Sequence, residues 1–219
     1  MSNENFDFNR FVSDSKETLQ RPKGYFETMS LTGGLTEPVI KSAFYGAAAG
    51  ALYFLWSLLH LSVVAGPFGG AIGIMVLIWT IIGSVIGLFI GAVIVLIISA
   101  IAKGNTDFEA CARISASLMV LLPVAALFSL LSAISLVFSL IVGLAINLYG
   151  LWLLYNALTI SLKADQQTSK IITIVLAALL ALFTLLGIGA KRATTRYLDK
   201  WEKSIDKDTK ELLEDFGIK

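Results

Sequence analysis

The stretch that decides the fold covers residues 71–102 and reads AIGIMVLIWTIIGSVIGLFIGAVIVLIISAIA. It contains no Asp, Glu, Lys or Arg, and as one helix it would be about 48 Å long, whereas the hydrocarbon core of a bilayer is about 30 Å thick. The charge-free region extends back to residue 42, and two further such regions cover residues 114–162 and 171–190. Because a charge at mid-bilayer costs roughly 2.5–3.5 kcal/mol, these regions predict a polytopic helical membrane protein.

The composition of the whole chain agrees with this class. Hydrophobic residues make up 56% of the sequence and charged residues 15%, whereas an average soluble chain has about 25% charged residues. The net charge is +1, and the basic residues lie in tails that carry nearly as many acids, so we expect no nucleic-acid partner. Cys111 is the single cysteine, which excludes an intrachain disulfide and a cysteine-ligated metal cluster.

The turn cluster Gly66, Pro67, Gly69 and Gly70 divides the first charge-free region, and the second divides near residues 132–135. We therefore predict an all-α bundle of about five transmembrane helices with amphipathic surface helices at both termini. The expected spans are residues 42–65, 71–102, 114–131, 136–162 and 171–190. The expected domains are an N-terminal tail at 1–40, a five-span domain at 41–190 and a C-terminal tail at 191–219.

Six crossings are the alternative. Five crossings divide Lys and Arg almost equally between the two sides of the membrane, and splitting residues 71–102 at Gly83 and Ser84 would give a better positive-inside distribution. We prefer five, because the split needs a tight turn between two marginal spans with only Ser84 to hydrate it. Five crossings place the C-terminal tail opposite the N-terminal tail.

Small residues recur every four positions in two spans: Ser42, Gly46 and Gly50 in the first, and Gly83, Gly87 and Gly91 in the second. Such stripes allow another helix backbone to approach closely. They are typical of a dimer interface or of packing within one chain. We favour packing of the first span against the second.

Two residues inside the spans are candidates for a special role. Asn147 is the most polar residue well inside a predicted span, and an interhelical hydrogen bond worth about 1 kcal/mol explains it. Pro123 removes one backbone hydrogen bond from the third span, and we favour a static kink over a transporter hinge. At the start of that span, Thr106 or Asp107 can cap the helix, and Glu109 and Arg113 form an i,i+4 pair.

Both tails are predicted to form surface helices. In the N-terminal tail one helical face carries Phe8, Phe11, Val12, Ser15 and Leu19, and a second segment begins at Pro22. These segments fit the headgroup layer of a bilayer. In the C-terminal tail, Tyr197, Trp201 and Ile205 lie on one apolar side and are the expected docking residues on a membrane or a partner.

These features together resemble the Yip-domain (Ypt-interacting protein) family. The resemblance covers roughly residues 20–190. It rests on five closely spaced spans and on the polar start of the third span, which has a proline in its middle. Two sequence segments also support it: Pro22-Lys23-Gly24-Tyr25-Phe26 before the spans and Tyr149-Gly150-Leu151-Trp152-Leu153-Leu154-Tyr155 in the fourth span. It implies a cytoplasmic N-terminus and no enzymatic activity. The short tails are more similar to a prokaryotic member, which implies a multi-pass protein of the cytoplasmic membrane.

The resemblance and the residues together give the predicted function. We expect no catalytic, cofactor-binding or metal-ligating residues, and we expect a non-enzymatic scaffold or accessory subunit that acts through helix packing and tail contacts. A small-solute transporter or channel is the alternative. The expected partners are the lipid bilayer and other membrane proteins or a second copy of the chain. Eukaryotic members are associated with Rab-type GTPases, but their Asp-Leu-Tyr-Gly-Pro stretch is absent here, which leaves GTPase binding in doubt.

Overall fold

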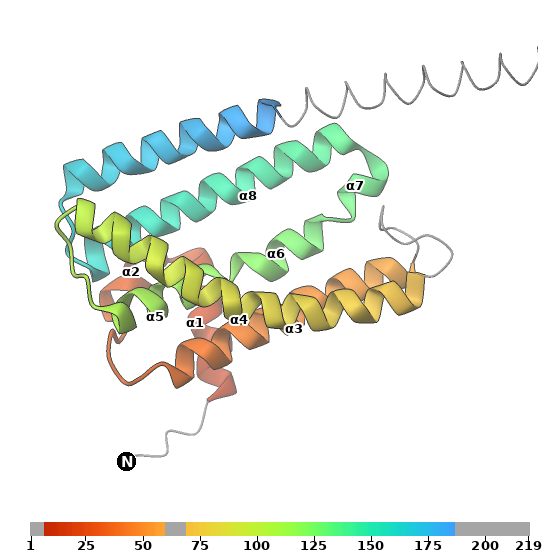
Figure 1. The fold of residues 1–219 in the computed structure, drawn as a ribbon, viewed down its shortest axis with the longest axis horizontal. Coiled ribbons are helices and arrows are strands. Elements are labelled where there is room, and N and C mark those ends of the chain that lie inside the picture. The colour runs from red at the N-terminus through yellow and green to blue at the C-terminus, as the bar shows by residue number, and fades with distance from the viewer. Residues whose placement is uncertain (1–6, 60–68, 187–219) are drawn as a thin grey trace, which may run out of the picture. The chain divides into compact units, whose positions relative to one another are not determined.

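The computed structural model describes residues 7–59 and 69–186, and in these ranges the chain is helical, with no strand (Figure 1). Five helical stretches there are long and apolar enough to cross a membrane: Thr36–Leu58, Gly73–Ile101, Phe108–Ile134, Val137–Ser161 and Gln166–Leu186. The predicted all-α polytopic bundle is thus confirmed. The chain divides into two compact units, Met1–Ala177 and Ala178–Lys219, and the sites described below lie in the first.

The first two spans pack against each other as α3 (Thr36–Leu58) and α4 (Gly69–Ile101). Helix α4 is continuous through Gly83 and Ser84, where the six-crossing alternative required a turn. A helix keeps its backbone hydrogen bonds internal, as hydrocarbon demands, and the Ser84 hydroxyl also donates to the carbonyl of Ile81 at 2.8 Å. Helix α3 begins at Thr36, before the predicted boundary at residue 42, and its charged first turns are paired with α1 through Lys41 and with α5 through Glu37.

The third span consists of three helical pieces, α5 (Phe108–Leu118), α6 (Leu121–Phe128) and α7 (Leu131–Ile134). Pro123 has no N–H to donate to the carbonyl of Met119, and the N–H of Leu122 binds that carbonyl instead at 2.9 Å. The helix therefore breaks at the turn before the proline. In the second piece, the indole N–H of Trp56 from α3 donates to the carbonyl of Ala126 at 2.9 Å.

The fourth span is α8 (Leu136–Asn156), which continues into the π-helical turn η1 (Ala157–Ser161). The connection after it pairs with the connection after α4. Asn105 donates its N–H to the carbonyl of Leu162 at 2.8 Å, and Asp165 donates to the carbonyl of Ala102 at 2.7 Å. These two bonds hold the α4–α5 loop beside the start of the last helix.

The N-terminal segment forms α1 (Phe8–Gln20) and α2 (Pro22–Thr28). The predicted start of a second helical segment at Pro22 is confirmed. The residues of the predicted apolar face of α1, however, do not all face the same surroundings. Phe11 is buried against the protein, and Phe8 and Val12 are exposed. The segment packs on its own spans because α1 and α2 present polar and aromatic groups that the spans bind, as described below.

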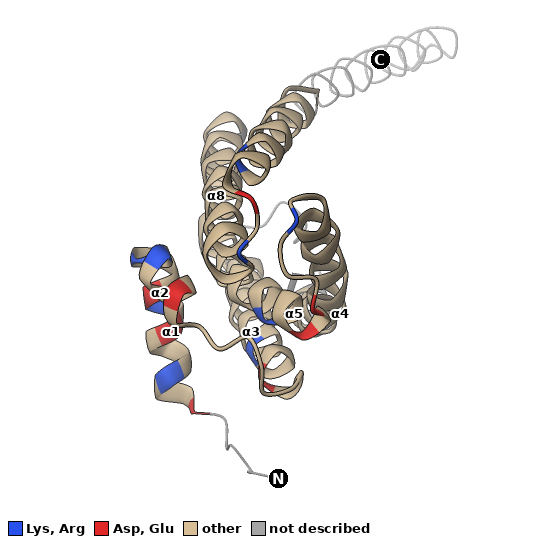
Figure 2. Ribbon diagram, turned by 90° about the vertical axis from the view of Figure 1, so that its left-hand side faces the viewer, with Lys and Arg blue, Asp and Glu red and all other residues tan. Residues whose placement is uncertain are grey.

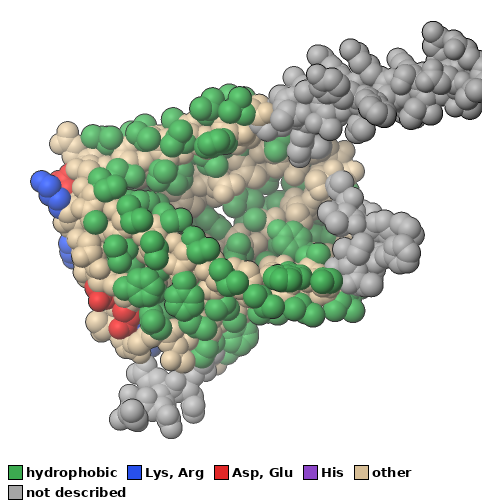
Figure 3. Space-filling model, viewed as in Figure 1, with side chains coloured by type: hydrophobic (Ala, Val, Ile, Leu, Met, Phe, Trp, Pro, Cys, Tyr) green, Lys and Arg blue, Asp and Glu red, His purple; other side chains and the backbone are tan. Residues whose placement is uncertain are grey.

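All charged residues in the described ranges lie in residues 7–41, 103–113 and 163–170. Figure 2 shows them on α1 and α2, at the start of α3 and α5, and in the connecting loops, and Figure 3 shows the hydrophobic side chains that cover the remaining length. One end of the bundle is thus charged, as expected for a membrane–water boundary. The predicted docking residues Tyr197, Trp201 and Ile205 lie outside the described residues.

Candidate functional site

The charged end is organised around Arg113, whose side chain is only 7% exposed. Its Nη1 binds Glu37 Oε2 of α3 at 2.7 Å, and its Nε binds Glu109 Oε1 one turn earlier in α5 at 3.1 Å. Its Nη2 donates to the carbonyl of Gly34 at 3.0 Å. The pair Glu109 and Arg113, predicted from i,i+4 spacing, is confirmed, and Arg113 additionally joins α5 to α3 and to the loop before it.

Lys41 continues these contacts toward α1. Its side chain is 10% exposed, and its Nζ lies 2.9 Å from Asp14 Oδ2 in α1 and 2.9 Å from Glu37 Oε1. Glu37 therefore binds both cations. We call Asp14, Glu37, Lys41, Glu109 and Arg113 the ion-pair network; it links α1, α3 and α5, and pairing of this kind satisfies cations that are otherwise costly to bury.

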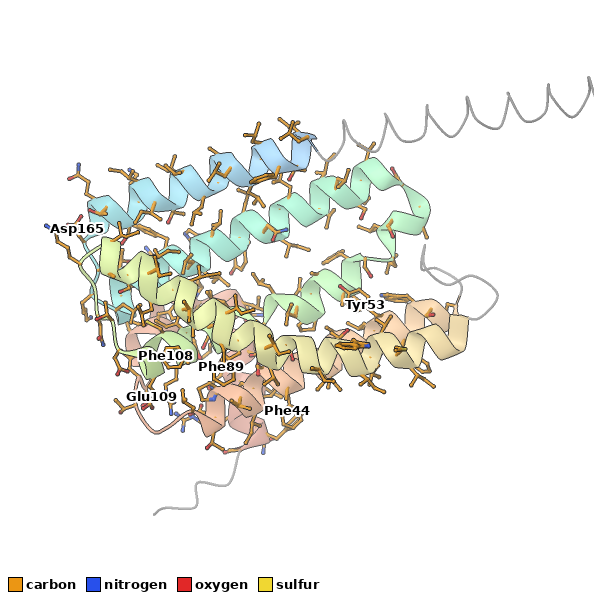
Figure 4. All side chains as sticks on the ribbon, viewed as in Figure 1. Phe44, Tyr53, Phe89, Phe108, Glu109 and Asp165 are labelled. Carbon is orange, nitrogen blue, oxygen red and sulfur yellow. The ribbon has the colours of Figure 1, made fainter. Side chains whose placement is uncertain are left out.

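Two glycines of the loop before α3 bring its backbone into contact with the ion-pair network. Gly33 has φ +129° and Gly34 has φ +90°, both in the region that glycine adopts readily. The N–H of Gly34 donates to Glu109 Oε1 at 2.6 Å. A Cβ at Gly33 would lie 2.8 Å from Nη2 of Arg113, so the backbone approaches the guanidinium as closely as a glycine allows. Figure 4 shows Glu109 at this end of the bundle.

Four side-chain hydrogen bonds fasten α1 and α2 to the spans. The hydroxyls of Tyr25 and Ser117 of α5 lie 2.8 Å apart, and those of Ser15 and Tyr45 of α3 lie 2.7 Å apart. The other two bonds have backbone acceptors: Tyr149 of α8 donates to the carbonyl of Leu19 at 2.6 Å, and Ser161 donates to the carbonyl of Phe26 at 2.7 Å. The N-terminal segment is therefore bonded to α3, α5, α8 and η1.

Two aromatic side chains of α2 are buried against the spans. Phe26 is 1% exposed and Tyr25 is 5% exposed, and their rings meet edge to face with centroids 5.3 Å apart. Burial raises the pKa of the Tyr25 hydroxyl, so it stays protonated and able to donate at neutral pH. A small polar cavity of about 90 Å³ remains between α1, α2 and the ion-pair network, and Arg10, Glu17 and Thr28 also line it.

The two predicted stripes of small residues contact different helices. A Cβ at Gly46 would meet Ser84 and Thr80, and one at Gly50 would lie 3.0 Å from Cα of Leu77, so both face α4. The second stripe does not face α3. A Cβ at Gly91 would meet Ser115 of α5, and one at Gly83 would meet nothing within 4 Å in the described parts of the chain.

Gly87, Gly91 and Asn147 instead line a common groove of about 540 Å³. Its walls come from α4, α5, α6 and α8, and Figure 3 shows this face of the molecule hollowed between α4 and α8. Asn147 was expected to form an interhelical bond. Its amide instead donates to the carbonyl of Gly143 in its own helix at 2.8 Å, which satisfies the group without a second helix.

A second, wider cleft of about 680 Å³ lies between α8 and residues 166–177 of the last helix. Leu148, Trp152 and Ile174 are among its apolar lining residues, and Asp165 and Lys170 are its charged ones. Asp165 was not singled out from the sequence. It lies at the same end of the bundle as Glu109 (Figure 4).

Sequence reasoning recognised Glu109 and Arg113 but missed Asp14, Glu37 and Lys41. A signal was present, because Lys41 and Arg113 each directly precede a long charge-free region. A cation at that border must find an anion near the membrane surface, and each of the two binds one carboxylate of its own helix and one of another helix. No spacing rule within one helix connects Asp14 to Lys41.

The comparisons with known proteins agree with the fold. Residues 16–188 match the family model described as the Yip1 domain, which confirms the resemblance expected from the sequence over residues 20–190. Comparison with curated proteins and with solved structures gave no match.

Proposed function

Because the chain belongs to the Yip1 domain family, and so is a multi-pass membrane protein, we propose that it is a non-enzymatic scaffold or accessory subunit. Its contact surface is the outward face of α1 and α2, which we call the platform. The platform consists of those exposed residues of the two helices, together with Arg21 between them, that do not line the small polar cavity, and its charged members are Lys16, Arg21, Lys23 and Glu27.

The observation that carries this proposal is the attachment of the N-terminal segment to three of the spans. The hydroxyls of Ser15 and Tyr25 bond to α3 and α5, the carbonyls of Leu19 and Phe26 accept from α8 and η1, and the Lys41–Asp14 pair adds an ionic contact. A segment fixed at many points has little conformational freedom left to lose when a partner binds. A preorganised surface of this kind suits a scaffold.

The platform also has the composition of a protein contact surface. It carries Lys, Arg and Glu side chains of both signs, and Phe8 at its edge is 56% exposed. Charges of both signs favour a protein with a complementary pattern over a uniformly anionic membrane surface. The partner we propose is therefore a membrane protein with a cytoplasmic or juxtamembrane polar region, or a second copy of this chain.

Site-specific photo-crosslinking in native membranes tests the proposal. A crosslinker at Lys16 or Lys23 should yield discrete protein adducts, and one at the exposed α4 position Ile86 should yield lipid adducts only. The double variant Tyr149→Phe, Ser161→Ala removes two of the fastening bonds and should weaken the adducts from Lys16. Lipid adducts alone from all platform positions would refute the scaffold.

A second candidate, a small-solute transporter or channel, is favoured by one observation. The broken third span lines the groove at Gly87, Gly91 and Asn147, and discontinuous helices often border substrate paths. Solute uptake into proteoliposomes tests this function. Filling the groove with Gly87→Trp should then abolish uptake, whereas the same change at Gly83, which does not line the groove, should leave uptake intact.

A further inference from the structure

The cleft between α8 and the last helix has an apolar wall. Leu148, Leu151 and Trp152 of α8 face Ile174 and Ala177 of the last helix. These residues belong to two helices that are long and apolar enough to cross a membrane, and Trp152 and Ile174 are 43% and 58% exposed, as expected of side chains that face lipid. The volume of about 680 Å³ lies within the range of about 300–1,000 Å³ that is typical of small-molecule sites.

The other end of the cleft is polar and carries both signs of charge. Lys170 is exposed and takes part in no ion pair among residues 7–59 and 69–186. Asp165 is exposed directly before the last helix, and Gln166 and Gln167 complete the polar lining. Tyr155 lies on the α8 side, an arrangement typical of the aromatic belt at a membrane boundary.

Asp165 is held as a carboxylate. Its Oδ2 accepts hydrogen bonds from the N–H of Thr168 at 2.8 Å and from the hydroxyl of Thr168 at 2.7 Å. These bonds lower the pKa of Asp165, with a smaller contribution from Lys103, which does not line the cleft. The carboxylate is therefore anionic at neutral pH. The same two bonds fix its position at the mouth of the cleft.

We propose that this cleft binds a phospholipid with a zwitterionic, primary-ammonium headgroup, of the phosphatidylethanolamine type. Lys170 receives the phosphate and Asp165 the ammonium, while one acyl chain lies against Trp152 and Ile174. An acidic lipid without an ammonium would bring no cation to Asp165, and a choline headgroup has no N–H to donate to it. The charged residues Asp165 and Lys170 and the apolar wall thus both favour a phospholipid of this class.

Native mass spectrometry of the delipidated full-length protein tests the site. It is titrated with phosphatidylethanolamine, phosphatidylglycerol and phosphatidylcholine of identical acyl chains. We expect the first lipid to bind about tenfold more tightly than the other two, a difference of about 1.4 kcal/mol. Lys170→Gln should remove most of this preference.

The matched control is Lys163→Gln, which removes the same charge from the same end of the bundle but does not line the cleft. It should retain the preference. Equal binding of the three lipids, or an equal loss in both variants, would overturn the proposal, since either result describes a general lipid shell. A third result would also overturn the proposal: the full-length protein binds none of the lipids, and the amides that border the cleft are protected from hydrogen exchange. That combination would mean that another segment of the chain occupies the cleft.

Discussion

Arg113 of α5 and Glu37 of α3 form a 2.7 Å ion pair in which the arginine side chain is 7% exposed. The two residues are far apart in the sequence, and their pairing joins the start of the first span to the start of the third. Because Glu37 also binds Lys41 and Lys41 binds Asp14, the pair connects the membrane domain to the N-terminal segment.

Arg113→Met should destabilise the protein by about 1–3 kcal/mol, because it leaves Glu109 and the carbonyl of Gly34 without their buried donor. The measurement is the unfolding midpoint in detergent, followed by tryptophan fluorescence. Arg21→Met is the control, since Arg21 is exposed between α1 and α2. Equal midpoints for the two variants would contradict a structural role for the ion-pair network.

The glycines of the α2–α3 loop should differ in their tolerance of a side chain. Gly33→Ala combines an unfavourable positive φ with a Cβ 2.8 Å from Arg113, and we expect a loss of about 1–3 kcal/mol. Gly34→Ala should cost less, because its Cβ meets nothing within 4 Å among the described residues. Gly24→Ala, in a helix and with no described atom within 4 Å of its Cβ, should cause no loss, because alanine favours the helix more than glycine does. Any other order of unfolding midpoints is evidence against the loop geometry.

Tyr25 and Ser117 should be energetically coupled. Their hydroxyls lie 2.8 Å apart at a buried position, and a double-mutant cycle with Tyr25→Phe and Ser117→Ala should give a coupling of about 0.5–1.5 kcal/mol. Unfolding in detergent supplies the four free energies. Strict additivity would mean that α2 is not bonded to α5 in solution.

The two glycine stripes should respond differently to bulk. Gly46→Leu places a side chain against Ser84 and the backbone of Thr80, and overpacking of this kind typically costs about 1–3 kcal/mol. Gly83→Leu enters open space and should cost nothing measurable. Comparable losses at both sites would restore the original expectation that the second stripe is a packing face.

The sequence was sufficient for the features that depend on hydropathy and local spacing. Charge-free regions predicted the five spans, Pro123 predicted a kink in the third, where α5 and α6 are separate helices, and the spacing of Glu109 and Arg113 predicted their pair. The contacts between distant segments required the fold. Small-residue spacing shows that a helix has a flat face but not which neighbour it meets, and so Gly91 was assigned to α3 although it faces Ser115 of α5.

Spacing also does not identify the surroundings of Asn147 or of the apolar face of α1. Asn147 can satisfy its amide within its own helix through Gly143, a possibility that spacing does not distinguish from an interhelical bond. Phe11 and Val12 are neighbours on one predicted apolar face, yet Phe11 is buried on the protein and Val12 is exposed. Amphipathic spacing identifies a surface helix without stating whether protein or lipid covers it.

Hydrogen–deuterium exchange of the full-length protein tests the central claim most directly, namely that α1 and α2 are fixed to the spans. We predict that amides of residues 15–26 exchange slowly in the wild type, and that the double variant Tyr149→Phe, Ser161→Ala, which removes two fastening bonds, speeds their exchange about tenfold while leaving α4 unchanged. Wild-type exchange at the rate of an unstructured peptide across residues 15–26 would contradict the account.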